Sequence, residues 1–284
     1  IVFAGIAAAF QIGKVPPVIP FLTAELSISL IFAGWIISSF NILGATIAPF
    51  AGALADFAGH RRMLGTGLII QAAGSFAGAV SSSPELLLAT RLVEGLGYIF
   101  VVVSAPTLII LASARKDVKV SFGIWGSFMP AGGAIMMVSA PIIAEAFGWR
   151  TLWVVNGVLG FSAALLVFYI LQPVPDEFKR RFSFIKVVSD VAEVVKMGTA
   201  ALFALIFACY AFQFMALIGF LPTMLADRGL AVTNAGFISA VVLGFNITGN
   251  LYGGVLLKRG VKRRTIITFA FAVIAVSSIF IYSE

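Results

Sequence analysis

The chain has 284 residues, of which 61% are hydrophobic and 11% are charged, and its mean hydropathy is +1.08. A soluble domain is about 45 to 50% apolar and about 25% charged, so this composition excludes a soluble globular protein and is typical of a polytopic membrane protein. The net charge of +7 does not indicate a nucleic-acid partner, because the basic residues lie in short links between apolar runs. The single cysteine, Cys209, excludes an intramolecular disulfide, a cysteine metal site and a redox pair.

Nine apolar stretches approach or exceed the length of about 20 residues that a helix needs to cross a bilayer. They are expected at 1–24, 30–55, 63–81, 85–111, 119–144, 150–171, 198–222, 234–257 and 265–282. The expected fold class is therefore an all-α membrane protein. The first stretch has neither an initial Met nor a charged leader region, so we expect the chain to begin inside its first helix and not with a signal peptide.

The distribution of Lys and Arg predicts the orientation. When the link at 56–62 is placed in the cytoplasm, 15 of these residues fall on that side and two, Arg150 and Arg228, on the other. Cytoplasmic links carry such an excess in multi-pass proteins. The sequence thus predicts a protein of the cell membrane with cytoplasmic links at 56–62, 112–118, 172–197 and 258–264.

One longer link divides six spans from three. Its Phe178, Phe182, Ile185 and Val188 recur at helical spacing among basic residues, a pattern that favours an amphipathic helix in the headgroup layer. A solvated basic linker is the alternative. The expected domains are a six-helix bundle at 1–172, a cytoplasmic link at 173–197 and a partial, three-helix bundle at 198–284.

An internal repeat is visible at an offset of 201 residues. It aligns Gly52 with Gly253, Gly59 with Gly260 and Arg61 with Lys262. Six helices, a link and then helices in the same order make a parallel repeat, which is one of the transporter architectures. Because the second copy has three helices, we expect a natural chain of roughly 370 residues or more.

Two motifs resemble signatures of the major facilitator superfamily of secondary transporters. The run from Gly52 to Arg61 resembles the family's link between its second and third helices, although Phe57 and His60 stand where a basic residue is usual. The run Arg91-Leu-Val-Glu-Gly-Leu-Gly97 is similar to the family's fourth-helix pattern. The resemblance covers the whole chain and implies the family's helical bundle, with a complete N-terminal six-helix half and three helices of the C-terminal half, truncated after the ninth helix.

The resemblance also implies a cytoplasmic gate. In such a gate the aspartate meets the N-terminal end of a helix from the other half, where the helix dipole favours an anion. The residues that it assigns to this gate are Gly52, Asp56, Gly59, Arg61 and Arg62. A solvated link whose charges only set the topology is the alternative.

Three charged residues lie deep in predicted spans: Lys14, Arg91 and Glu94. Each costs about 2.5 to 3.5 kcal/mol to insert, so we expect them to face an interior cavity and a partner. Arg91 and Glu94 are three residues apart on one helix face. We predict Lys14, Gln11 and Arg91 as substrate contacts and Glu94 as a proton carrier. The alternatives are a structural ion pair and a lysine that reaches toward the interface.

Three amides complete the predicted substrate site. Asn246 and Asn250 share a helix face at i and i+4, and Gln213 lies in the middle of the seventh span. For each of them, hydrogen bonding between helices is the alternative.

Together these features predict a monomeric secondary active transporter of a small solute in the lipid bilayer, without a cofactor or metal. Two cations against one acid within the spans favour an anionic solute, with the proton as the candidate coupling ion. A non-transporting sensor of the same fold and an efflux carrier of lipophilic compounds remain alternatives. An enzyme is disfavoured because the sole histidine, His60, lies in a link and the spans hold no metal or Ser-His constellation.

Overall fold

A computed structural model describes residues 1–172 and 182–282, except for the side chains of 41–43, 45 and 278–282. Within these residues the secondary structure is helical, with no strand, which confirms the expected fold class. Phe178 of the predicted interfacial helix lies outside the described residues.

The first span is interrupted by prolines. Helix α1 (Val2–Gly13) ends before a short 3-10 helix, η1 (Pro16–Val18), and α2 (Ile19–Leu26) completes the span. Proline lacks a backbone N–H and clashes with the preceding turn, so Pro16 and Pro17 end the regular helix here. Lys14 therefore lies at the C-terminal cap of α1.

The remaining helices correspond to the predicted spans and to the link after the sixth span. The first six spans are completed by α3 (Leu30–Ala58), α4 (His60–Ala79), α5 (Pro84–Ala112), α6 (Val118–Gly126) with α7 (Phe128–Phe147), and α8 (Trp149–Ile170). They are followed by α9 (Phe184–Lys196), α10 (Gly198–Asp227), α11 (Val232–Lys258) and α12 (Arg263–Tyr282). By length and composition, six helical segments of the described residues can cross a membrane, which indicates a multi-pass protein.

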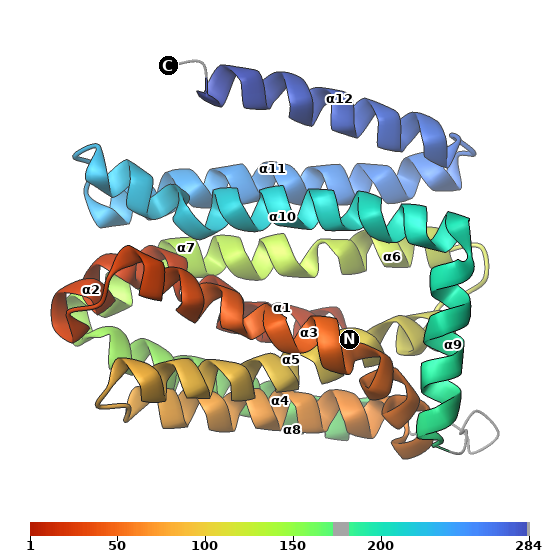
Figure 1. Cartoon of the computed structure of the whole chain (residues 1–284), viewed down its shortest axis with the longest axis horizontal. Helices are drawn as coiled ribbons and strands as arrows, with labels where there is room; N and C mark the ends of the chain where they lie inside the picture. The colour runs from red at the N-terminus through yellow and green to blue at the C-terminus, as the bar shows by residue number, and fades with distance from the viewer. Residues whose placement is uncertain (173–181, 283–284) are drawn as a thin grey trace.

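The long helices lie side by side, and their links fall at two ends of the bundle (Figure 1). The α3–α4, α5–α6 and α11–α12 links share one end, and the α4–α5, α7–α8 and α10–α11 links share the other. The links that the sequence assigns to the cytoplasm thus lie together. Gly59 and Gly260 both have positive φ, +94° and +87°, so the chain turns in the same glycine-favoured conformation at the two repeated positions.

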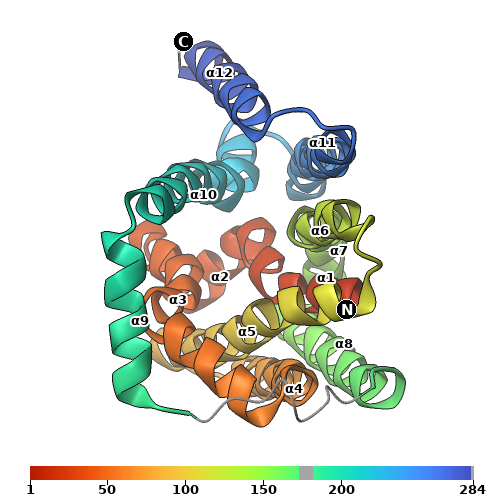
Figure 2. The ribbon, with the colours of Figure 1, turned by 90° about the vertical axis from the view of Figure 1, so that its right-hand side faces the viewer.

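Helix α9 lies across the end of the bundle that carries these basic links (Figures 1 and 2). Phe184 at its start stacks on Phe50 of α3, with the ring centroids 4.9 Å apart. Ile185 and Val188 are exposed, as an interfacial helix requires. Its position in a headgroup layer stays a prediction.

Glycine allows α4 and α5 to pack with their backbones in contact. A Cβ atom added to Gly97 would lie 2.4 Å from the carbonyl oxygen of Gly67, closer than any side chain can approach. Small residues at such positions are the usual means of close helix packing in membranes. The second glycine of the fourth-helix motif therefore has a packing role.

Helix α11 joins the first six spans through α6 and α7. A Cβ atom added to Gly254 would lie 3.1 Å from the Cα of Gly123 and 3.1 Å from the carbonyl oxygen of Lys119. Beyond this contact the Lys119 Nζ donates to the carbonyl oxygen of Leu257 at 3.1 Å. Around Gly254, α6 and α11 thus meet through their backbones, with little side chain between them.

This contact predicts a difference between two adjacent glycines. Gly254→Val places methyl groups against α6, and overpacking of this kind typically costs about 1 to 3 kcal/mol. Gly253 has no atom near its added Cβ, so Gly253→Val is the matched control for helix propensity. We expect a lower midpoint of thermal unfolding in detergent for Gly254→Val than for Gly253→Val. Equal midpoints would contradict the packing of α6 on α11.

Candidate functional site

A cavity of about 840 Å³ lies between the first six spans and helices α10 and α11. We call it the central cavity. Most of its wall is aromatic or aliphatic. The aromatic lining residues are Tyr98, Trp125, Phe128, Phe207, Tyr210, Phe212, Phe214 and Phe220. No charged side chain is among the described residues that line it.

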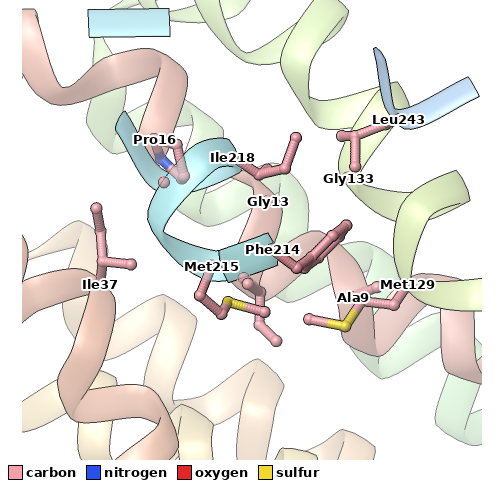
Figure 3. A pocket seen from close by; sticks show the side chains of 12 residues that line it. Ala9, Gly13, Pro16, Ile37, Met129, Gly133, Phe214, Met215, Ile218 and Leu243 are labelled. Atoms are coloured by element: carbon pink, nitrogen blue, oxygen red, sulfur yellow. The ribbon is translucent and has the colours of Figure 1, made fainter. Parts of the chain in front are cut away.

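A small apolar pocket adjoins this cavity where α10 meets the break in the first span (Figure 3). It shares Phe214, Met215, Met129 and Ile37 with the central cavity. Its opposite wall includes Gly13 of α1. The cavity wall therefore continues to the helix that carries Lys14.

The polar part of the central cavity is an amide pair on α11. Asn250 donates from Nδ2 to the Oδ1 of Asn246 at 2.9 Å, and Asn246 donates from Nδ2 to the hydroxyl oxygen of Tyr210 at 3.0 Å. The two asparagines line the cavity, as the helical spacing indicated. Gln213 of α10 is half-buried and is not among the lining residues.

The second group of polar residues is buried within the first six spans. The Lys14 Nζ donates to Glu94 Oε1 at 2.7 Å, and Arg91 forms an ion pair with the other oxygen of the same carboxylate. Lys14, Arg91 and Glu94 are each at most 1% exposed. Arg91 also donates to the backbone carbonyl of Gln11 at 2.8 Å. We call these four residues the buried charge cluster.

Two glycines allow the helices to pack closely around this cluster. A Cβ atom on Gly74 would lie 2.8 Å from the Glu94 Cγ, and one on Gly95 would lie 2.5 Å from the carbonyl oxygen of Phe40. Glycine at these two positions lets α4 and α3 approach α5 closely enough to enclose Glu94 and Arg91. Gly95, the first glycine of the fourth-helix motif, thus helps to set the position of Arg91.

The side chains of the cluster do not point into the central cavity. Lys14, Gln11 and Arg91 were expected to face an interior cavity, but none of them lines the central cavity. The Arg91 guanidinium lies 4.6 Å from the ring centroid of Phe40, and Phe40 packs on Tyr98, which does line it. Glu94 and nearby backbone carbonyls satisfy the cations at shorter range. Contact of these residues with substrate stays a prediction.

The structure therefore brings the predicted site residues together as two groups. Sequence spacing indicated the Arg91–Glu94 pair and the Asn246–Asn250 pair, but it gave no sign of the contact between Lys14 and Glu94, 80 residues apart. It also missed the aromatic wall and Trp153, whose ring centroid lies 4.4 Å from the Lys14 Nζ. The aromatic content of 13% was the available signal for the wall.

The predicted gate residues lie at the α3–α4 turn. The Oδ1 of Asp56 is 3.2 Å from the Nε2 of His60, so the residue at a usually basic position becomes its partner. Arg61 donates to the carbonyl oxygen of Phe168 near the end of α8. Arg62 is exposed. Among the described residues, Asp56 forms no hydrogen bond or ion pair with a helix of the other half, so the gate stays a prediction.

An ion pair links the two parts of the chain at the same end of the bundle. The Lys258 Nζ at the end of α11 is 2.8 Å from the Oδ1 of Asp117, just before α6. This hydrogen bond lowers the pKa of the Asp117 carboxyl below its usual value. Both side chains are exposed to more than a third of their surface, so the pair contributes little on its own.

Comparison with known proteins agrees with this architecture. Over 245 residues the chain is 28% identical to the hexuronate transporter of Bacillus subtilis (strain 168), an alignment that covers 80% of this chain and 56% of that protein. It is 27% identical over 158 residues to the methylenomycin A resistance protein of the same organism, covering 55% of this chain and 34% of the relative. The chain thus spans about a third to just over half the length of these curated relatives.

A solved structure has the same fold. The crystal structure of a bacterial homologue of the human lysosomal transporter Spinster, in an inward-facing and unoccupied conformation, aligns with a TM-score of 0.66 at 17% identity. The alignment covers 87% of this chain and 60% of that chain. The model of the Major Facilitator Superfamily matches residues 1–283. Helical fold, paired motifs and family match agree, and the chain belongs to the Major Facilitator Superfamily.

Proposed function

We propose that this protein is a secondary active transporter that carries a small organic solute through the central cavity by alternating access. The observation that carries the proposal is the cavity itself, about 840 Å³ in volume, which lies between the first six spans and helices α10 and α11. Parallel-repeat transporters bind their solute at the interface of the two repeats and rock the repeats around it. Membership of a transporter family supports the same conclusion.

The lining favours a lipophilic, aromatic solute. Ligand pockets of this size bury their ligand mainly against apolar and aromatic side chains and orient it with a few polar groups. Rings such as Trp125 and Phe214 offer stacking faces, and Asn246 with Tyr210 offers a hydrogen-bonding end. The described lining contains no cation that would hold an anionic group. An efflux carrier of lipophilic compounds fits this chemistry.

An organic anion is the second candidate. Two cations, Lys14 and Arg91, share the single carboxylate of Glu94 in the buried charge cluster, and the hexuronate transporter is among the relatives. For an anion to reach these cations, Phe40 and Tyr98 must move aside, because they stand between Arg91 and the central cavity. Solute binding without solute flux would identify a sensor instead.

We also place proton coupling at the buried charge cluster, with Glu94 as the residue that it requires. Intramembrane carboxylates paired with cations are characteristic of proton pathways in transporters. Glu94 contacts both Lys14 of α1 and Arg91 of α5. A change of charge at this point would alter the attachment of α1 to the rest of the bundle.

A pair of fluorescent probes tests the substrate class. N-phenyl-1-naphthylamine is a neutral aromatic amine, and 8-anilino-1-naphthalenesulfonate carries the same rings with a sulfonate. With the natural full-length protein in nanodiscs, and empty nanodiscs as the blank, we expect saturable and tighter binding of the neutral probe. Phe214→Ala should weaken it about tenfold, because burial of a Phe side chain is worth about 1.5 to 3 kcal/mol.

Phe203→Ala is the control for this probe experiment. Phe203 lies on the same helix, is exposed and does not line the central cavity. Its substitution should leave the affinity unchanged. Tighter binding of the sulfonate probe would favour the organic anion, and equal loss of affinity in both variants would place the probe outside the central cavity.

Counterflow in proteoliposomes tests transport and coupling together. A panel of neutral aromatic compounds, organic anions and sugars identifies a transported solute, and a pH-sensitive dye in the lumen reports proton movement. We expect Glu94→Gln to abolish proton movement with the solute, because the cluster loses its carboxylate. Glu85→Gln, in the first turn of the same helix, is the control. Unchanged proton movement in Glu94→Gln would refute the coupling role.

A further inference from the structure

The charges of the buried charge cluster do not balance. Lys14 and Arg91 carry two positive charges, and Glu94 carries one negative charge. All three side chains are at most 1% exposed. An uncompensated charge in such surroundings costs several kcal/mol, so the cluster favours a state in which one cation has lost its charge.

The acid–base chemistry of the three side chains determines which one becomes uncharged. An arginine side chain keeps its proton in proteins, so Arg91 stays charged. Protonation of Glu94 would leave two buried cations without an anion and would increase the imbalance. The neutral arrangement is the one in which Lys14 is an uncharged amine beside the Arg91–Glu94 ion pair.

The hydrogen bonds of Lys14 instead stabilise its charged form, the ammonium. Its Nζ donates to the Oε1 of Gln11 at 2.6 Å, to the Oγ of Ser75 at 2.8 Å and to Glu94. The Ser75 hydroxyl itself donates to the carbonyl oxygen of Trp153 at 2.7 Å, so it can only accept from Lys14. Three acceptors match the three N–H groups of an ammonium, and a neutral amine has two.

These two effects oppose each other, because the uncharged amine removes the excess charge but gives up one hydrogen bond. The side chains that face Lys14 from the other helices are Ser75 of α4, Arg91 and Glu94 of α5, and Trp153 of α8. Of these, Arg91 and Glu94 form the ion pair described above.

We propose that Lys14 is the proton-exchange site of this protein, with Glu94 as its fixed counter-ion. Protonated Lys14 ties α1 to α4 through Ser75 and to α5 through Glu94, with its Nζ over the Trp153 ring of α8. The uncharged amine has one N–H fewer for its three hydrogen bonds and no charge for the contact with Trp153. Because α1 also forms a wall of the small pocket beside the central cavity (Figure 3), protonation of Lys14 is linked to the shape of the solute site. This inference rests on the proposed transport function and names its coupling group.

Nuclear magnetic resonance of the full-length protein labelled at the lysine ¹³Cε atoms tests this directly, without any solute. Lys14→Gln assigns the Lys14 resonance, and Lys14→Arg assigns it independently if the first variant does not fold. We expect this resonance to move from the ammonium to the amine position between about pH 5 and about pH 9. A Lys14 resonance that stays in the ammonium position throughout would overturn the proposal.

Transport assays give the second measurement. In Lys14→Gln, uncharged at every pH, the solute flux that remains should carry no accompanying proton movement, whereas Lys116→Gln, at the exposed α5–α6 link, should retain both flux and proton movement. Proton movement that persists in Lys14→Gln would overturn the assignment. Absence of flux for every compound in the panel would count against the transport function alone, because the Lys14 titration is measured independently of it.

Discussion

The interaction on which this structure depends is the pairing of Glu94 with Lys14 and Arg91 inside the first six spans. A single carboxylate shared by two cations pairs both of them in a low-dielectric interior and leaves one positive charge in excess. This pairing also requires particular surroundings. Helix α1 ends, before Pro16 and Pro17, where Lys14 can reach α5, and glycines at 74 and 95 leave room for Glu94 and for the approach of α3. The break in the first span and these glycines thus make the arrangement possible.

The buried charge cluster and the central cavity lie in different parts of the structure. Charged groups lie within the first six spans, while the central cavity presents rings and amides from α5, α6, α7, α10 and α11. Phe40 contacts both Arg91 and Tyr98, and Tyr98 lines the cavity. In the transport function proposed above, solute selectivity and energy coupling would depend on different residues, connected through α1 and α5.

Sequence reasoning succeeded where the physical constraint was local. The lengths of the apolar runs predicted the helices, and the repeated turns at Gly59 and Gly260 were visible because a positive φ strongly favours glycine. The Arg91–Glu94 pair follows from helical spacing. The contact between Lys14 and Glu94 depends on the rotation and depth of two helices distant in sequence, which their own patterns do not specify.

The cavity wall escaped sequence analysis for a related reason. Helices in a bilayer are apolar on the lipid side as well as the inner side, so Phe203 and Phe214 of α10 look alike in sequence although only the second lines the cavity. Hydrophobic periodicity cannot separate these faces. The sequence predicted three amides, Asn246, Asn250 and Gln213, as substrate contacts. In the structure the two asparagines line the cavity and Gln213 does not.

The position of helix α9 affects how α10 is connected to the first six spans. Its first turn is held against the first six spans by the stack of Phe184 on Phe50, and its last residue precedes Met197, which is extended (φ −76°, ψ 97°) before α10 begins. Met197 therefore joins a helix that is held against the first six spans to the first helix of the second half. In the proposed alternating-access cycle, a change in the dihedral angles of Met197 would reorient α10 and leave both neighbouring helices intact.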